Sequence, residues 1–216
     1  MVIWHLSVGI LLAGILAVWF GYRQPQGGFY LFKPLTTVLI ILIPILGTED
    51  ISLLTGLILA GLIFSLLGDI FLMLPGDRFL EGLIAFLAAH LFYISGFLID
   101  QRTPVFWPLL PMLTLSGLIG WYLYGGMGKM KIPGFAYLGV ISAMVWLAWS
   151  RWISGGQLEQ LLGLSGASLF LLSDFILAIN RFKIKFRAAR ALNLTTYYAG
   201  QYLIALSVIT LGLGLD

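Results

Sequence analysis

Long apolar runs fill almost the whole chain and leave only short polar connections between them. Crossing the hydrocarbon core of a bilayer takes about 20 residues of α-helix. By this measure the sequence divides into eight apolar segments: Ile3–Phe20, Pro34–Leu46, Ile51–Leu74, Phe79–Ile99, Val105–Tyr124, Ile132–Ile153, Leu158–Asn180 and Ala191–Leu213. The second is short and contains Pro44, so we expect it to be kinked, tilted or thinly covered. The pattern predicts an all-α, polytopic membrane helix bundle of about eight transmembrane helices, with residues 1–216 forming a single domain.

The composition excludes a water-soluble fold for such a chain. Hydrophobic residues make up 60% of it and charged residues only 10%, whereas a soluble domain carries about 25% charged residues. There is no cysteine, so disulfides and thiol chemistry are excluded. No basic residue precedes the first apolar run, which is the reverse of a cleavable signal peptide, and we expect that run to be retained as a helix.

The basic residues indicate an orientation in the membrane. Basic residues favour cytoplasmic connections, and only Arg102 and Arg151 lie in or beside the even-numbered connections. We therefore expect the odd-numbered connections to be cytoplasmic and both termini to lie outside. For the basic cluster Arg181–Arg190, a lipid-headgroup site is the alternative explanation. The odd-numbered connections hold Arg23, Lys33, Arg78, Lys129, Lys131, Arg181, Lys183, Lys185, Arg187 and Arg190.

Two carboxyl groups inside the predicted spans are the strongest indication of a function. An Asp at the centre of a membrane helix costs about 2.5–3.5 kcal/mol on insertion scales, so such a residue usually faces the bundle interior. Asp69 lies six residues before Pro75, and Asp174 lies seven residues before Arg181. This spacing places both carboxyl groups at a similar depth on the same side of the membrane. The alternative is a structural role, in which the carboxylate hydrogen-bonds a neighbouring helix.

Further polar side chains belong to the same half of the predicted bundle. Residues three or four positions apart share one face of a helix, and the polar residues of the second, fourth and eighth segments follow this spacing. Their common depth predicts one inward-opening polar pocket. The alternatives are interhelical hydrogen bonds and, for the histidine, a satisfied core position. The residues are Lys33, Thr37, His90, Tyr93, Asn193, Tyr197, Tyr198 and Gln201.

Several kinds of catalytic or binding site are excluded. His5 and His90 are the only histidines, so a multi-histidine zinc site cannot be built. The sequence contains no Gly-x-Ser-x-Gly nucleophile elbow and no phosphate-binding glycine loop. We expect no metal, no other cofactor and no nucleic-acid partner. The functions that the sequence still allows are acid–base chemistry by carboxylates and proton coupling.

Four sequence blocks, taken in order, resemble the YhhN-like lysoplasmalogenase family of membrane proteins. They extend from the third to the eighth segment, over about two thirds of the chain. The blocks are Gly68-Asp69, Phe79-x-x-Gly82-x-x-x-Phe86-x-x-x-His90-x-x-Tyr93, Gly166-Ala167-Ser168-Leu169-Phe170-x-x-Ser173-Asp174-x-x-Leu177-Ala178 and Tyr197-Tyr198-x-x-Gln201-x-x-Ile204.

The resemblance implies hydrolysis of the vinyl ether bond of a lysoplasmalogen to a fatty aldehyde and glycerophospho-choline or -ethanolamine. This reaction needs a protonated acid and an anion beside the developing oxocarbenium ion, as in glycosidases. We therefore hypothesise that Asp69 and Asp174 form the catalytic pair and that Lys33 meets the substrate phosphate. The other expected substrate-binding residues are His90, Tyr93, Tyr197, Tyr198 and Gln201.

The resemblance also implies a cellular location and a lipid substrate. We expect a bacterial inner (plasma) membrane protein that contacts membrane lipids and admits a lysophospholipid sideways from the inner leaflet. A proton-coupled transporter or lipid-translocating protein is the main alternative, because carriers also bury paired acids. Such carriers are often built from internal repeats, and the similarity between residues 66–72 and 171–177 would fit a repeat of this kind. A structural subunit without chemistry is the third possibility, and the oligomeric state is not predicted.

Overall fold

The computed structural model describes residues 2–99, 101 and 103–209, and this part of the chain contains helices and no strand. Six of its helices are long and apolar enough to cross a membrane, and α5 and α8 are the two α-helices that fall outside this group. The all-α membrane bundle predicted from the sequence is confirmed. Its elements are α1 (Val2–Gly21), α2 (Gly27–Gly47), α3 (Leu53–Met73), α4 (Phe79–Ile99), α5 (Leu109–Leu123), the short 3₁₀ turns η1 (Tyr124–Gly126) and η2 (Gly128–Met130), α6 (Lys131–Gly155), α7 (Leu158–Phe182) and α8 (Ala189–Leu206).

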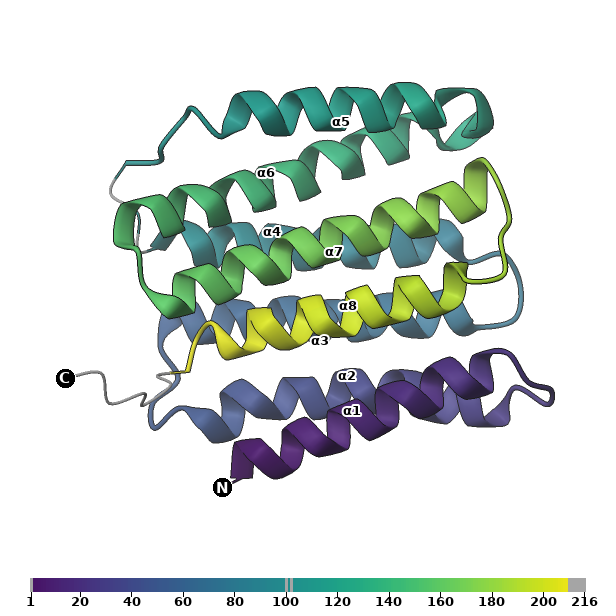
Figure 1. Ribbon diagram of the computed structural model, residues 1–216, viewed down its shortest axis with the longest axis horizontal. Helices are drawn as coiled ribbons and strands as arrows, with labels where there is room; N and C mark the ends of the chain where they lie inside the picture. Colours follow the sequence, from purple (N-terminus) through teal and green to yellow (C-terminus); the bar gives the residue numbers. More distant parts are fainter. Residues whose placement is uncertain (1, 100, 102, 210–216) are drawn as a thin grey trace.

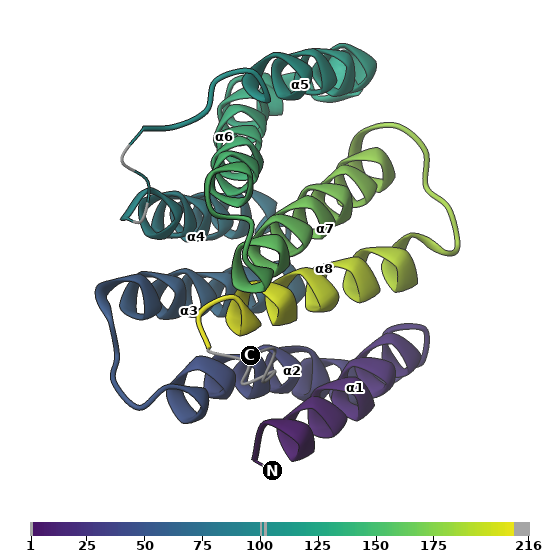
Figure 2. The same cartoon turned by 60° about the vertical axis from the view of Figure 1, so that its left-hand side comes forward.

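The helices alternate in direction, so that all odd-numbered connections lie at one end of the bundle (Figure 1). The even-numbered connections and the N-terminus lie at the other end. The strongest packing is between α7 and α8, between α3 and α4, and between α1 and α2. In the rotated view α3 lies between α2 and α4, and α5 lies on the outside against α6 (Figure 2). The basic residues of the odd connections are thereby gathered at one end.

Helix α2 is much longer than the predicted segment, because it begins at Gly27 rather than Pro34. The predicted segment leaves out Gly27 and Gly28, because glycine commonly ends or interrupts a helix. In the structure a Cβ at Gly28 would lie 2.4 Å from the ring of Phe20, so glycine there allows α1 and α2 to approach closely. A consequence is that Lys33 lies well inside the helix and not at its end.

Two other predicted boundaries also shift. The fifth segment was expected from Val105, but α5 begins at Leu109. Val105 instead hydrogen-bonds α6, because its N–H donates to Ser150 Oγ at 2.6 Å and its carbonyl accepts from Trp146 Nε1 at 2.8 Å. Helix α8 ends at Leu206; positions 210–213 of the predicted segment lie outside the described residues, as does Arg102.

Two glycines set the separation of α7 and α8. A Cβ at Gly166 would lie 2.7 Å from the carbonyl oxygen of Gly200, and one at Gly200 would lie 2.9 Å from that of Gly166. Small residues let membrane helices pack backbone to backbone. This contact holds the polar face of α8 against the bundle interior.

We expect Gly166→Ala to destabilise the protein by about 1–3 kcal/mol, the usual effect of overpacking. The added methyl group would meet backbone atoms of α8 that have no rotamer to escape into. The thermal midpoint in detergent measures this effect. Gly139→Ala is the matched control, because a Cβ at Gly139 on α6 has nothing within 4 Å. Equal midpoints for the two variants would contradict the close packing of α7 and α8.

Candidate functional site

The Asp69 carboxylate lies in a closed cluster between α2, α3 and α8. Its Oδ1 is 3.2 Å from Lys33 Nζ, and its Oδ2 accepts hydrogen bonds from Thr37 Oγ1 at 2.6 Å and Tyr197 Oη at 2.8 Å. Lys33 Nζ also donates to the Asp69 backbone carbonyl at 3.0 Å. Lys33 and Thr37 are one turn apart on α2, so both face α3. Asp69 is only 1% exposed, and each carboxylate oxygen already has a partner.

A second polar group lies one turn along the same helices. Tyr93 Oη on α4 donates to Gln201 Oε1 at 2.7 Å and lies 3.3 Å from Ser65 Oγ. Ser65 and Gln201 are each one turn from the α3 and α8 residues of the Asp69 cluster. Gln201 Nε2 is buried without a hydrogen-bond partner in the described part of the chain. Tyr198 Oη donates to the Lys33 carbonyl at 3.4 Å, so it supports the cluster from outside.

Asp174 lies in different surroundings, at the wall of an apolar cavity between α4, α5, α6 and α7. Tyr137 Oη on α6 donates a hydrogen bond to Asp174 Oδ2. The empty space of the cavity, including its open mouth, is about 770 Å³. Near Asp174 the lining residues are Phe86, Tyr137, Leu138, Ile141, Leu171 and Phe175, and toward the odd-connection end they are Leu72, Phe79, Met127, Met130, Ala178 and Phe182.

His90 lies behind the wall of this cavity. Its ring packs edge-on against Tyr137 and Phe170, with ring centroids 5.1 and 4.6 Å away. The side chain is fully buried, and neither ring nitrogen has a hydrogen-bond partner within the described residues. His90 therefore supports the ring of Tyr137 from the side opposite the cavity and does not line it.

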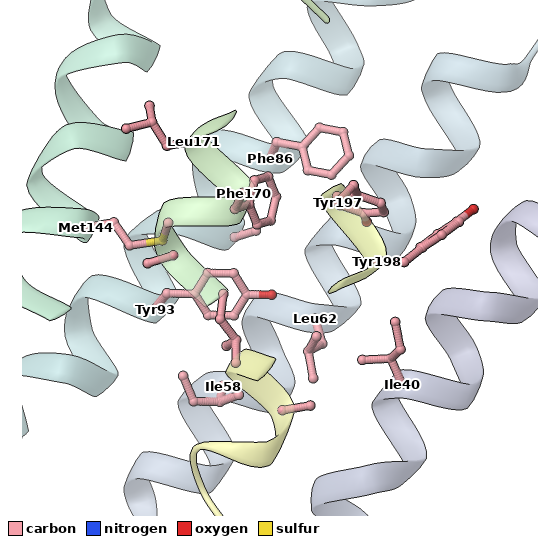
Figure 3. Close-up of a cluster of buried hydrophobic side chains, with 14 of the residues drawn as sticks. Ile40, Ile58, Leu62, Phe86, Tyr93, Met144, Phe170, Leu171, Tyr197 and Tyr198 are labelled. Atoms are coloured by element: carbon pink, nitrogen blue, oxygen red, sulfur yellow. The ribbon is translucent and has the colours of Figure 1, made fainter. Parts of the chain in front are cut away.

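The two aspartates do not meet. They share no hydrogen-bond partner in the described residues: Asp69 is held by α2 and α8, and Asp174 by α6. The rings of Phe86, Phe170 and Tyr197 pack edge-to-face against one another, with centroids 5.4–5.9 Å apart (Figure 3), and they connect the cavity, which Phe86 lines, to the Asp69 cluster, which contains Tyr197. Instead of one polar pocket there is a closed ion-pair cluster and a separate apolar cavity, joined through aromatic contacts.

Comparison with known proteins establishes the family. A model of the YhhN family matches residues 28–208, which include α3 to α8 and both aspartates. The chain belongs to the YhhN family. The resemblance seen in the four sequence blocks is thereby confirmed.

Relatives of this YhhN-family chain come from bacteria and mammals. It is 32% identical over 202 residues to the uncharacterized membrane protein YhhN of Escherichia coli, covering 93% of this chain and 97% of the relative. It is 35% identical over 161 residues to the bovine lysoplasmalogenase TMEM86A, covering 70% of this chain and 65% of the relative. It is 36% identical over 149 residues to the porcine lysoplasmalogenase TMEM86B, covering 68% and 61%. No solved structure matches the chain.

Two features of the YhhN-family site differ from the sequence hypothesis. Lys33, expected to meet a substrate phosphate, is 5% exposed and paired with Asp69, so it is not at a surface where a headgroup could reach it. Tyr137, which the sequence hypothesis omitted, is the hydrogen-bond donor to Asp174. A single tyrosine in the predicted segment Ile132–Ile153 carries no spacing signal that could have indicated this contact. Among the described residues no group of three or more His, Cys, Asp or Glu could hold a metal ion.

Proposed function

We propose that this YhhN-family protein is an intramembrane hydrolase that cleaves the vinyl ether bond of a lysoplasmalogen-type lysolipid. The observation that carries the proposal is a carboxyl group, Asp174, at the wall of an apolar cavity that reaches the basic end of the bundle. The lysoplasmalogenase names of the mammalian relatives supply the reaction class. A single aliphatic chain matches a cavity lined by Leu, Ile, Met and Phe side chains.

Asp174 is assigned the role of proton donor. The acid must hold a proton when the substrate arrives and must then face the cation it has created. In the described part of the chain no Lys or Arg pairs with Asp174, and its one hydrogen bond comes from Tyr137. Asp69, by contrast, is paired with Lys33 and accepts two further hydrogen bonds. Asp174 is thus the carboxyl group available to a substrate.

The reaction begins with proton transfer from the Asp174 carboxyl to the outer alkene carbon of the vinyl ether. The alkene electron pair forms the new C–H bond, and the adjacent carbon becomes part of an oxocarbenium ion beside the new carboxylate. Water adds to that carbon and returns a proton to Asp174. The hemiacetal then breaks its bond to the glycerol oxygen, giving a fatty aldehyde and a glycerol hydroxyl group. Tyr137 orients the carboxyl group throughout and supports its ionised form by hydrogen bonding.

The depth of Asp174 suits this substrate. Seven residues separate it from Arg181, which corresponds to about 10 Å along a helix. A phosphate at the bundle end would place the ether bond, one glycerol unit further in, near this depth. Lys131 and Lys183 lie at that end, 3.7 and 4.9 Å from the rings of Tyr124 and Tyr122. These two side chains, rather than Lys33, are therefore proposed to meet the phosphate, with the alkyl chain in the cavity.

Asp69 is assigned a positioning role. Its carboxylate fixes the hydroxyl group of Tyr197, whose ring packs against Phe86, a lining residue of the cavity. Tyr93, Tyr198, Gln201 and His90 act in the same way, by holding α3, α4 and α8 in register around the aromatic wall. The cavity is not lined by Asp69 or by any of the side chains that support it from behind, which are Tyr93, His90, Tyr197, Tyr198 and Gln201.

The test is direct conversion by the purified protein in detergent. A vinyl ether lysophosphatidylethanolamine should release fatty aldehyde, and in D₂O the aldehyde should carry one deuterium on the carbon next to the carbonyl. A saturated ether lysolipid is the control, because it has no alkene to protonate, and it should give no product. Vinyl ether substrate left intact by the purified protein, together with uptake into protein-containing vesicles, would contradict the proposal and identify a carrier.

Tyr137→Phe is expected to lower kcat by about 10- to 100-fold, since a hydrogen bond to a charged group contributes about 1.5–3 kcal/mol. KM should change little, because the ring and its contact with His90 are retained. Tyr124→Phe is the control, since Tyr124 is exposed at the end of α5 and should leave kcat unchanged. A Tyr137→Phe variant with unaltered kcat would contradict the role of Tyr137 in orienting the acid.

A further inference from the structure

A basic pocket and an apolar groove meet on the side of the bundle formed by α1 and α8. The groove lies between these two helices and is lined by Ile10, Leu11, Ile15 and Val18 of α1 and by Ala199 and Tyr202 of α8. Its empty space, including the open side, is about 1600 Å³. Both helices lie in front of α2 and α3 in Figure 1, so the groove runs along the outside of the bundle. It is separate from the cavity that contains Asp174.

The basic pocket lies at the odd-connection end of this groove. It contains Arg23, Arg187 and Arg190 together with the amides of Gln24, Gln26 and Asn180. Tyr22 and Arg23 line both the pocket and the groove, so the two spaces adjoin each other. Among the described residues no Asp or Glu forms an ion pair with any of the three arginines. The pocket therefore has a positive charge that no acidic residue in the described part of the chain neutralises through an ion pair.

The walls of the pocket are fixed by hydrogen bonds. Tyr22 Oη at the end of α1 donates to the Arg187 carbonyl at 2.7 Å and accepts from the Ala191 N–H of α8 at 3.1 Å. The Arg190 guanidinium lies over the rings of Tyr22 and Phe29, 5.8 and 5.3 Å from their centroids. Arg23 stacks on Trp19 at 3.9 Å. The arginines are thus held by defined contacts around the junction of α1 with α8.

We propose that this pocket and groove bind an anionic phospholipid of the surrounding leaflet, separate from the substrate. The phosphate would be held by the three arginines, because guanidinium groups bind phosphate oxygens in a bidentate manner. The neutral amides would hydrogen-bond headgroup hydroxyl groups, and one acyl chain would occupy the groove between α1 and α8. Clusters of Lys and Arg beside membrane helices commonly bind anionic lipids, and here an acyl-chain groove adjoins the cluster. The occupant fits a phosphatidylglycerol-type lipid in charge and shape.

The bound lipid would also stabilise the bundle interior. Tyr198 lines the groove and donates a hydrogen bond to the Lys33 carbonyl, next to the residues that hold Asp69. An acyl chain in the groove would cover Tyr198 and close α1 onto α8. The proposal therefore predicts a rise in thermal midpoint on lipid binding, whether or not the protein has the hydrolase activity proposed above.

The experiment compares lipid binding by three forms of the full chain in detergent. Native mass spectrometry and the thermal midpoint are measured with added phosphatidylglycerol, with phosphatidylcholine and with inorganic phosphate. Wild type should retain phosphatidylglycerol and melt at a higher temperature with it. The Arg23→Gln/Arg187→Gln/Arg190→Gln variant should retain about tenfold less phosphatidylglycerol than wild type, consistent with the strength of guanidinium–phosphate pairs. Its thermal midpoint should no longer rise when this lipid is added. The Arg78→Gln/Lys129→Gln/Lys185→Gln variant, with the same change in charge at exposed positions of the same end of the bundle, should behave as wild type.

Each other result overturns the proposal. Equal loss in the Arg78→Gln/Lys129→Gln/Lys185→Gln control would show a general charge effect, and unchanged retention in the Arg23→Gln/Arg187→Gln/Arg190→Gln variant would exclude the pocket. A midpoint rise with inorganic phosphate as large as that with phosphatidylglycerol would exclude the acyl-chain groove. Because the Arg190 side chain also packs on aromatic rings, the Arg23→Gln/Arg187→Gln variant provides a second test, and it too should retain less lipid than wild type.

Discussion

Asp174→Asn is expected to reduce aldehyde release from a vinyl ether lysolipid by about 10²- to 10⁴-fold, the usual contribution of a general acid. The amide keeps the size of the side chain and can still accept a hydrogen bond from Tyr137. It has no acidic proton to give to the alkene carbon. The loss should therefore appear in kcat, with the thermal midpoint close to that of wild type.

Glu159→Gln is the matched control for this prediction. Glu159 is a partly exposed acid in the first turn of the same helix, α7. It lies at the end of the bundle that is opposite the cavity mouth, so its loss should leave turnover unchanged. Turnover by Asp174→Asn within a few-fold of that of the control would rule out Asp174 as the acid.

Asp69→Asn is expected to destabilise the fold strongly, by about 3–5 kcal/mol, the usual effect of removing one partner of a buried ion pair. Lys33 would remain buried at 5% exposure with no opposing charge. The thermal midpoint or the denaturant midpoint in detergent measures the effect. Asn can still accept hydrogen bonds from Thr37 and Tyr197, so the main loss is electrostatic.

The Lys33→Met/Asp69→Asn variant separates charge from packing. Removing both charges leaves a side chain of similar length in place of Lys33, and replacing a buried pair by apolar groups is often neutral for stability. The double variant should therefore recover most of the stability that Asp69→Asn loses. A double variant less stable than Asp69→Asn would mean that the two side chains do not depend on each other.

Much of the architecture could be predicted, because backbone N–H and C=O groups inside a bilayer must form hydrogen bonds within the protein, and a helix forms them within one segment. Apolar runs of spanning length then mark the helices with little ambiguity. The start of α2 was missed because Gly27 and Gly28 were read as a break, whereas at Gly28 close contact with Phe20 decides the structure. Because of this difference Lys33 lies inside α2, where it pairs with Asp69, and not at the helix end, where it could meet a phosphate.

The candidate site could be predicted only in part. Spacing along a helix fixes the depth of Asp69 and Asp174, but it does not fix the face that each helix turns to its neighbours. Depth alone made the two acids look like partners, although Lys33 on α2 pairs with one and Tyr137 on α6 with the other. Such long-range pairing depends on how the helices pack, which apolar periodicity does not encode. The four sequence blocks that resemble the family identify the region of the site, but they do not indicate that Asp69 and Asp174 lie in separate surroundings.

The most direct test of the account compares turnover per folded molecule in Lys33→Met/Asp69→Asn and in Asp174→Asn. If Asp174 alone donates the proton, the double variant should keep turnover within about tenfold of wild type, since it loses no group that touches the substrate. Asp174→Asn should release aldehyde about 10²- to 10⁴-fold more slowly than wild type under the same conditions. An inactive but folded double variant, beside an active Asp174→Asn, would contradict the account and place the reacting acid at Asp69.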